Sequence, residues 1–166
     1  KISTEHAIKG SKLIINYLPK LAKDLQNINL REMVSKACIH AGLAFSNTKT
    51  AIAHNISYPI TLKYDIKHGI ACSFTLPIIM RSLQGINEET ENKLKMIFDD
   101  NLENSAIKLT SILSNLKVPQ NLKELKIHKD EWNKIIEYAF KGERGRNFLG
   151  NQESFYKAVI ASNFFN

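Results

Sequence analysis

Two histidines, His54 and His68, lie in an apolar stretch rich in small residues that runs from Phe45 to Leu76. Neutral imidazole is a common protein ligand for zinc, iron and other borderline metals. Two such side chains in one segment suggest metal binding, but they supply only half of a site, because a stable site needs three or four protein ligands. A histidine in an apolar helix is more often a hydrogen-bonded core residue, so for each histidine that interpretation stays open.

The spacing of the two histidines restricts how they can share a metal. They are 14 residues apart in the sequence. On one unbroken helix they would share a face but lie about 21 Å apart. The sequence between them offers a break, first at Pro59 and then over 64–67, before Gly69. We therefore expect a helix–loop–helix that turns back between Pro59 and Gly69 and brings the imidazoles together.

The elements around this segment show helical periodicity, with almost no strand signals. The apolar spacing predicts helices over residues 3–21, 30–45, 68–84, 88–98, 102–116, 130–140 and 153–164, and a further helix from near Thr48 to Pro59 or soon after it. Pro19 and Pro77 lie inside predicted helices and are expected to kink them. Small residues in the second helix should allow close helix–helix approach; they are Ala37, Ala41, Gly42 and Ala44. We expect a single all-α domain over residues 1–166, a bundle of about seven or eight helices.

Composition excludes several classes of protein. The 166 residues, 43% of them hydrophobic, suffice for one domain with a core. The sequence contains no run of about 18 apolar residues, which a membrane span would require, and no signal peptide opens the chain. The net charge of +7 comes mostly from lysines scattered singly along helix faces, which argues against nucleic-acid binding. The densest basic stretch, 141–146, is short and interrupted by glycine.

The two cysteines, Cys38 and Cys72, are too few for a disulfide framework. Both occur in apolar segments, and free cysteine is among the most buried residue types. We therefore expect two buried free thiols in a protein of the reducing cytoplasm.

The segment around the histidines resembles the iron-containing (group III) alcohol dehydrogenases. The residues that carry the resemblance are Ala41-Gly42-Leu43-Ala44-Phe45-Ser46-Asn47, His54, Pro59, His68-Gly69 and Leu76-Pro77. Proteins of that family join an N-terminal nucleotide-binding α/β domain to a C-terminal helical domain. One aspartate and three histidines hold a divalent iron or zinc in the cleft between the domains. The resemblance covers most of the chain and implies that His54 and His68 are the last two of these ligands.

The resemblance implies an enzyme, a metal-dependent alcohol dehydrogenase or aldehyde reductase linked to NAD(P). Its metal would be Fe²⁺ or Zn²⁺, and NAD(P)H would be bound mainly by an N-terminal domain that these residues lack. Because the chain opens with Lys1 and lacks the aspartate and the first histidine, we expect a C-terminal fragment that is inactive by itself. We also expect a small alcohol or aldehyde substrate and a cytoplasmic homo-oligomer. The alternative is a non-catalytic helical interaction module or a self-associating fragment.

One position departs from the common family pattern. Many members carry a further histidine four residues after the first signature histidine, where this chain has Tyr58. That spacing places Tyr58 on the same helix face as His54. We expect Tyr58 on the substrate side of the site, where a phenol can hydrogen-bond a substrate oxygen but does not relay a proton near neutral pH as histidine does.

The residues around Thr48 and Lys49 are similar to those of the phosphonoacetaldehyde reductase subgroup, whose substrate carries a phosphonate. A helix N-terminus with Thr48 and Lys49 beside it would suit such an anion. The competing interpretation is that Thr48 is an N-cap and that Lys49 is merely solvated.

Overall fold

The computed structural model describes residues 1–165, and these form ten helices with no strand among them. The helices are α1 (Ile2–Leu21), α2 (Ile28–Phe45), α3 (Ile52–Tyr64), α4 (His68–Ser73), α5 (Leu76–Ser82), α6 (Glu88–Phe98), α7 (Leu102–Asn115), α8 (Lys129–Lys141), α9 (Glu143–Arg146) and α10 (Gln152–Ala161). The predicted all-α class is therefore confirmed. Within residues 1–165, no helix combines the length and the apolar character that crossing a bilayer requires.

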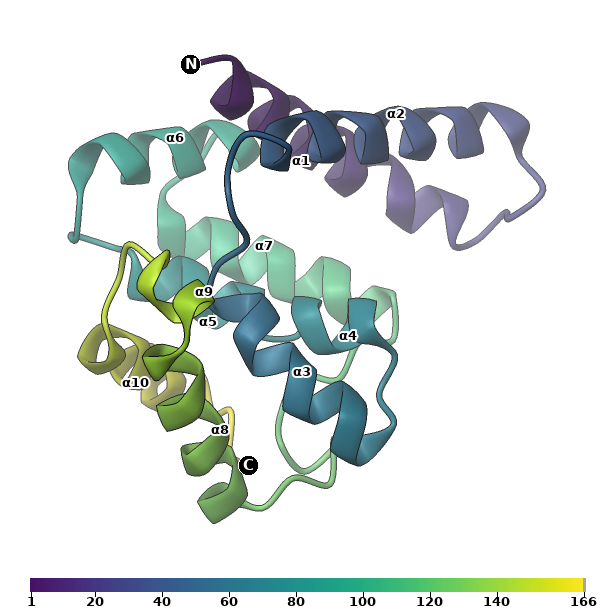
Figure 1. Ribbon diagram of the computed structural model, residues 1–166. Coiled ribbons are helices and arrows are strands. Elements are labelled where there is room, and N and C mark those ends of the chain that lie inside the picture. The colour runs from purple at the N-terminus through teal and green to yellow at the C-terminus, as the bar shows by residue number, and fades with distance from the viewer. Residues whose placement is uncertain (166) are drawn as a thin grey trace.

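Helices α1 and α2 form a hairpin at one end of the molecule, and α6 and α7 contact α1 below it (Figure 1). The buried Gly10 of α1 faces α2, where a Cβ would lie 3.2 Å from both the Ala37 carbonyl oxygen and the His40 Cβ. Ala37 itself is buried. The predicted close approach through small residues is thus confirmed at Ala37, whereas the space beside Gly42 is open.

The main core lies among α3, α4, α5, α7, α8 and α10 and is built on stacked aromatic side chains. The indole of Trp132 in α8 lies 4.9 Å from the Phe164 ring, measured between centroids, and Phe74 lies 5.7 Å from Phe164. Trp132 and Phe155 are 0% exposed. This core anchors the elements that carry the histidines, because α3 packs against α8 and α4 packs against α3.

Helix α3 differs from its prediction at both ends. It begins at Ile52 rather than near Thr48, and it continues through Pro59 to Tyr64. A proline inside a helix costs about 3 kcal/mol, because it removes one backbone hydrogen bond and crowds the preceding turn. Ile56 and Ile60 flank Pro59 and are 0% exposed. Burial of each isoleucine contributes about 1.5–3 kcal/mol, which together offsets the proline and keeps the helix intact.

The predicted helix over 68–84 is two helices in the structure. Helix α4 ends at Ser73, and α5 begins at Leu76 with Pro77 in its first turn. Proline is favoured there, since the first amides of a helix have no intrahelical partner. Pro77 therefore marks a new helix start rather than a kink.

The prediction that both cysteines are buried was wrong. Cys38 is exposed and Cys72 is half-buried, and both are free thiols. Helix α2 buries the face that includes Ala37 against α1. Cys38, one residue further along, is turned by about 100° from that face and meets solvent.

Candidate metal centre

Helix α3 presents two opposite faces, and this polarity positions the first histidine. Ile52, Ile56 and Ile60 follow one another at four-residue spacing and are at most 1% exposed. They hold one face of α3 against the core. His54 and Tyr58, also four residues apart, lie on the face that the core leaves free and are half-buried and exposed respectively.

A three-residue bend between α3 and α4 positions the second histidine. Asp65 ends α3 in the left-handed region, with φ of 52° and ψ of 32°, and Lys67 is the N-cap of α4. His68 is the first residue of α4, which lies beside α3 (Figure 1). The predicted helix–loop–helix is confirmed, and the reversal lies at 65–67, within the interval expected between Pro59 and Gly69.

The bend brings together side chains that the sequence separates by four helical turns. The ring centroids of His54 and His68 are 5.6 Å apart, with the rings tilted by 66° in an edge-to-face arrangement. The Tyr58 ring stacks on His68 at 5.8 Å with an angle of 13°. All three side chains that we singled out in this segment therefore share one site.

Two smaller side chains complete the cluster. Ser57 is 0% exposed, and its hydroxyl donates to the His54 carbonyl oxygen at 2.8 Å and lies 3.5 Å from Nδ1 of His68. Cys72 follows His68 by one helical turn, with its Sγ 3.5 Å from Nε2 of His68. One donor atom from each of His54, His68 and Cys72 can be chosen so that all three lie within 4.8 Å of one another. Our sequence reasoning missed Cys72, although its four-residue spacing from His68 was visible.

The electrostatics of the cluster favour metal binding by its histidines rather than by its thiol. Burial lowers the pKa of His54, and the nearby His68 and Arg144 lower it further. The His54 imidazole is therefore neutral near pH 7, with a lone pair free for a metal. Burial raises the pKa of the Cys72 thiol, which disfavours the thiolate form that binds a metal. Two imidazoles and a thiol are donors that zinc, iron and similar divalent ions accept, so these residues fit such a metal.

An arginine that we did not select borders the cluster. The guanidinium carbon of Arg144 lies 5.2 Å from the Tyr58 ring centroid, and Nε donates to the Thr50 hydroxyl at 2.9 Å. Gly145 makes this placement possible, because a Cβ there would lie 2.1 Å from the Ala139 carbonyl oxygen in the tight turn from α8 into α9. The available signal was the dense basic stretch at 141–146.

Thr48 and Lys49 lie beside Arg144 rather than at a helix N-terminus. The Thr48 hydroxyl donates to the Ala44 carbonyl oxygen at 3.2 Å, and Ala51 is the N-cap of α3, so Thr48 is not an N-cap. The Lys49 ammonium pairs with Glu143 at 2.6 Å, and both side chains of this pair are mostly exposed to solvent. Thr48, Lys49 and Arg144 line one pocket of about 420 Å³.

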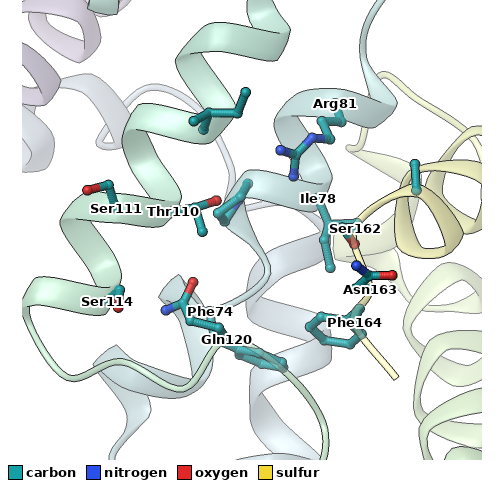
Figure 2. Close-up of a pocket in the computed structure, with 13 residues that line it drawn as sticks. Phe74, Ile78, Arg81, Thr110, Ser111, Ser114, Gln120, Ser162, Asn163 and Phe164 are labelled. Atoms are coloured by element: carbon teal, nitrogen blue, oxygen red, sulfur yellow. The ribbon is translucent and has the colours of Figure 1, made fainter. Parts of the chain in front are cut away.

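A larger pocket of about 540 Å³ lies elsewhere, between α5, α7 and the segment after α10 (Figure 2). Its charged side chain is Arg81, whose Nε donates to the Glu103 carboxylate at 3.0 Å. The lining residues that the structure describes include no histidine, cysteine or carboxylate. The described lining of this pocket therefore provides fewer groups that could bind a metal or transfer a proton than the α3–α4 cluster does.

Comparison with known proteins gives a family match over nearly the whole chain. The model of the Fe-containing alcohol dehydrogenase family, C-terminal, matches residues 2–162. The NAD-dependent methanol dehydrogenase of Bacillus methanolicus is 36% identical over 76 residues, which are 46% of this chain and 20% of that protein. The phosphonoacetaldehyde reductase of Streptomyces viridochromogenes is 34% identical over 64 residues, 39% of this chain and 16% of that protein.

Solved structures share the fold. A sulfoacetaldehyde reductase from Bifidobacterium kashiwanohense, solved in complex with NAD⁺, superposes with a TM-score of 0.86 at 22% identity. The superposition covers 99% of this chain and 44% of that structure. The chain thus spans less than half the length of each of these three proteins.

Proposed function

Because this chain belongs to the Fe-containing alcohol dehydrogenase family, whose C-terminal domain it matches, we propose that it is the metal-holding part of an NAD(P)-linked alcohol dehydrogenase or aldehyde reductase. His54 and His68 are two of the metal ligands, and a domain outside these residues binds most of the nucleotide. The observation that carries the proposal is the α3–α4 bend, which sets the two imidazoles 5.6 Å apart.

Each side chain of the cluster has a separate task in this proposal. A bound Fe²⁺ or Zn²⁺ supplies Lewis acidity to the oxygen of the alcohol or aldehyde. His54 and His68 hold the metal through ring nitrogens, and the buried Ser57 hydroxyl, 3.5 Å from Nδ1 of His68, helps to orient that ring. Tyr58 stacks on His68 and is exposed, so it fixes the plane of the ring and offers a hydroxyl to the substrate.

Metal removal tests this proposal in the whole protein, nucleotide-binding domain included. We expect NAD(P)H-dependent reduction of small aldehydes to disappear after dialysis against a strong chelator and to return when Fe²⁺ or Zn²⁺ is added. The 166-residue chain alone should show no turnover. Activity that survives complete metal removal, checked by elemental analysis, would contradict the metal-dependent mechanism. Full turnover by the chain alone would contradict the proposed division between the two domains.

We further propose that the substrate is an aldehyde with an anionic group, such as a phosphonate. Two similar proteins are named for phosphonoacetaldehyde and sulfoacetaldehyde, which supports an anionic substrate. Arg144 is half-buried and lies beside Tyr58 at the edge of the cluster, and it shares its pocket with Lys49 and Thr48. A guanidinium binds phosphonate or sulfonate oxygens through two parallel hydrogen bonds. Arg144 would therefore hold the charged end of the substrate, assisted by Lys49 and Thr48.

Replacement of Arg144 by methionine separates anion recognition from the rest of the reaction. A hydrogen bond to a charged group contributes about 1.5–3 kcal/mol, so we expect kcat/KM for phosphonoacetaldehyde to fall roughly 10- to 150-fold. With a neutral aldehyde of similar size, kcat/KM should change less than about threefold. Arg146→Met is the matched control, since Arg146 is exposed and its guanidinium donates to the Lys141 carbonyl oxygen. Equal losses with both substrates would contradict the role of Arg144.

A further inference from the structure

A buried hydrogen bond attaches the α8–α9 turn, which carries Arg144, to the helix that carries His54. The side-chain amide of Asn55, the residue after His54, donates through Nδ2 to the Ala139 carbonyl oxygen at 2.9 Å. Asn55 is 7% exposed, and it precedes Ala139 by 84 positions in the sequence. A buried polar side chain whose partner lies on a distant element fixes how the two elements sit relative to each other.

The acceptor of this hydrogen bond belongs to the last turn of α8, where carbonyl groups have no partner within the helix. Helix α8 ends at Lys141, so the carbonyl oxygens of its last turn need other donors. The Gly142 amide donates to the Tyr138 carbonyl oxygen at 3.2 Å, and Asn55 donates to the next one, that of Ala139. Asn55 thus closes the end of α8 from outside the helix, at the point where the chain turns into α9.

Two glycines show how closely the turn packs around this contact. A Cβ at Gly142 would lie 2.5 Å from Nδ2 of Asn55, and a Cβ at Gly145 would lie 2.1 Å from the Ala139 carbonyl oxygen. Gly142 has φ of −74° and ψ of 164°, which any residue adopts, so it is the contact with Asn55 that excludes a side chain there. Because the two glycines flank Arg144, the contact constrains the backbone on both sides of the arginine.

We propose that Asn55 is a positioning residue for Arg144 and sets how far the guanidinium lies from the metal-binding histidines. This inference rests on the proposed function, in which Arg144 holds the anionic end of the aldehyde. Asn55 directly follows His54 on α3, so one helix links the two ends of the substrate site. Arg144 also donates to the Thr50 hydroxyl at 2.9 Å, but Thr50 precedes α3 and that hydrogen bond is only partly buried.

Steady-state kinetics of the whole protein, nucleotide-binding domain included, test the inference. In Asn55→Ala we expect kcat/KM for phosphonoacetaldehyde to fall roughly 5- to 10-fold, mainly through KM, and kcat/KM for a neutral aldehyde of similar size to change less than about twofold. The loss is selective because the guanidinium is displaced while the histidines keep their places. Metal per chain, measured by elemental analysis, should therefore stay unchanged.

Gly142→Ala disturbs the same contact from its other side and provides a second variant. The new Cβ displaces the Asn55 amide, so the same selective loss is expected. Combining Gly142→Ala with Asn55→Ala should add little, because the shorter side chain leaves the space that the Cβ needs. Asn104→Ala is the matched control, since Asn104 is exposed on α7 and its amide donates to Asp100 at 3.0 Å.

The outcomes separate this inference from the proposed function. If Arg144→Met is selective but Asn55→Ala lowers kcat/KM equally for both aldehydes, or for neither, Asn55 does not act through Arg144 and the proposed function stands. A full further loss when Asn55→Ala is added to Arg144→Met also overturns the inference. If Arg144→Met itself is not selective, the anionic substrate is refuted and the inference with it. Circular dichroism shows whether each variant keeps its helices, and Gly142→Ala decides the inference if Asn55→Ala is unfolded.

Discussion

Replacing His54 or His68 with alanine is expected to remove the metal from the whole protein, with a fall in metal affinity of more than about 100-fold. The estimate follows because loss of a hydrogen-bond partner of a ligand already costs roughly 10- to 100-fold, and loss of the ligand itself removes a metal–nitrogen bond. Metal per chain, measured by elemental analysis after gel filtration, and aldehyde reduction should fall together.

A matched control shows whether the loss of metal is caused by the missing ligand or by unfolding. His68 is exposed, so His68→Ala should change the free energy of unfolding by no more than about 0.5 kcal/mol in the metal-free chain. His128→Ala replaces a histidine that is also exposed and lies outside the cluster, at the N-cap of α8. Unchanged metal content in both His54→Ala and His68→Ala would refute the ligand assignment.

Trp132→Ala should have the largest effect on stability, lowering the free energy of unfolding by about 3–5 kcal/mol. Trp132 is 0% exposed and contacts the aromatic rings of the core, with Phe164 at 4.9 Å and Phe155 at 6.5 Å between centroids. Truncation leaves a cavity that the surrounding helices fill only in part. Urea denaturation of the 166-residue chain, followed by circular dichroism, measures the change.

Two further substitutions show whether packing is the cause. Tyr138→Ala removes a large side chain from the same helix, but Tyr138 is 68% exposed, so the effect should stay within about 0.5 kcal/mol. Trp132→Phe should cost less than Trp132→Ala, because most of the volume remains and the indole Nε1 has no hydrogen-bond partner among residues 1–165 to lose. Equal effects of Trp132→Ala and Tyr138→Ala would show that the aromatic cluster does not stabilise the core.

Much of the fold could be predicted because helices are encoded locally. Apolar side chains repeat at three- and four-residue spacing, and Asn87 caps α6 by accepting the Thr90 amide at 2.9 Å. The prolines were harder to interpret. Pro59 remains inside α3 while Pro77 begins α5, although buried residues flank both prolines. Burial is a tertiary property that periodicity indicates only in outline.

The amino-acid sequence by itself determined that His54 and His68 could meet only across a bend, because a helix rises about 1.5 Å per residue and 14 residues span too far. Tertiary structure alone decided what else joins them. Arg144 contacts Tyr58, which lies 86 positions earlier in the sequence, and Lys49 pairs with Glu143, which lies 94 positions later. Such contacts follow from how α8 and α9 pack against α3. That packing depends on the shapes of many side chains at once, whereas spacing along one helix depends only on its own pitch.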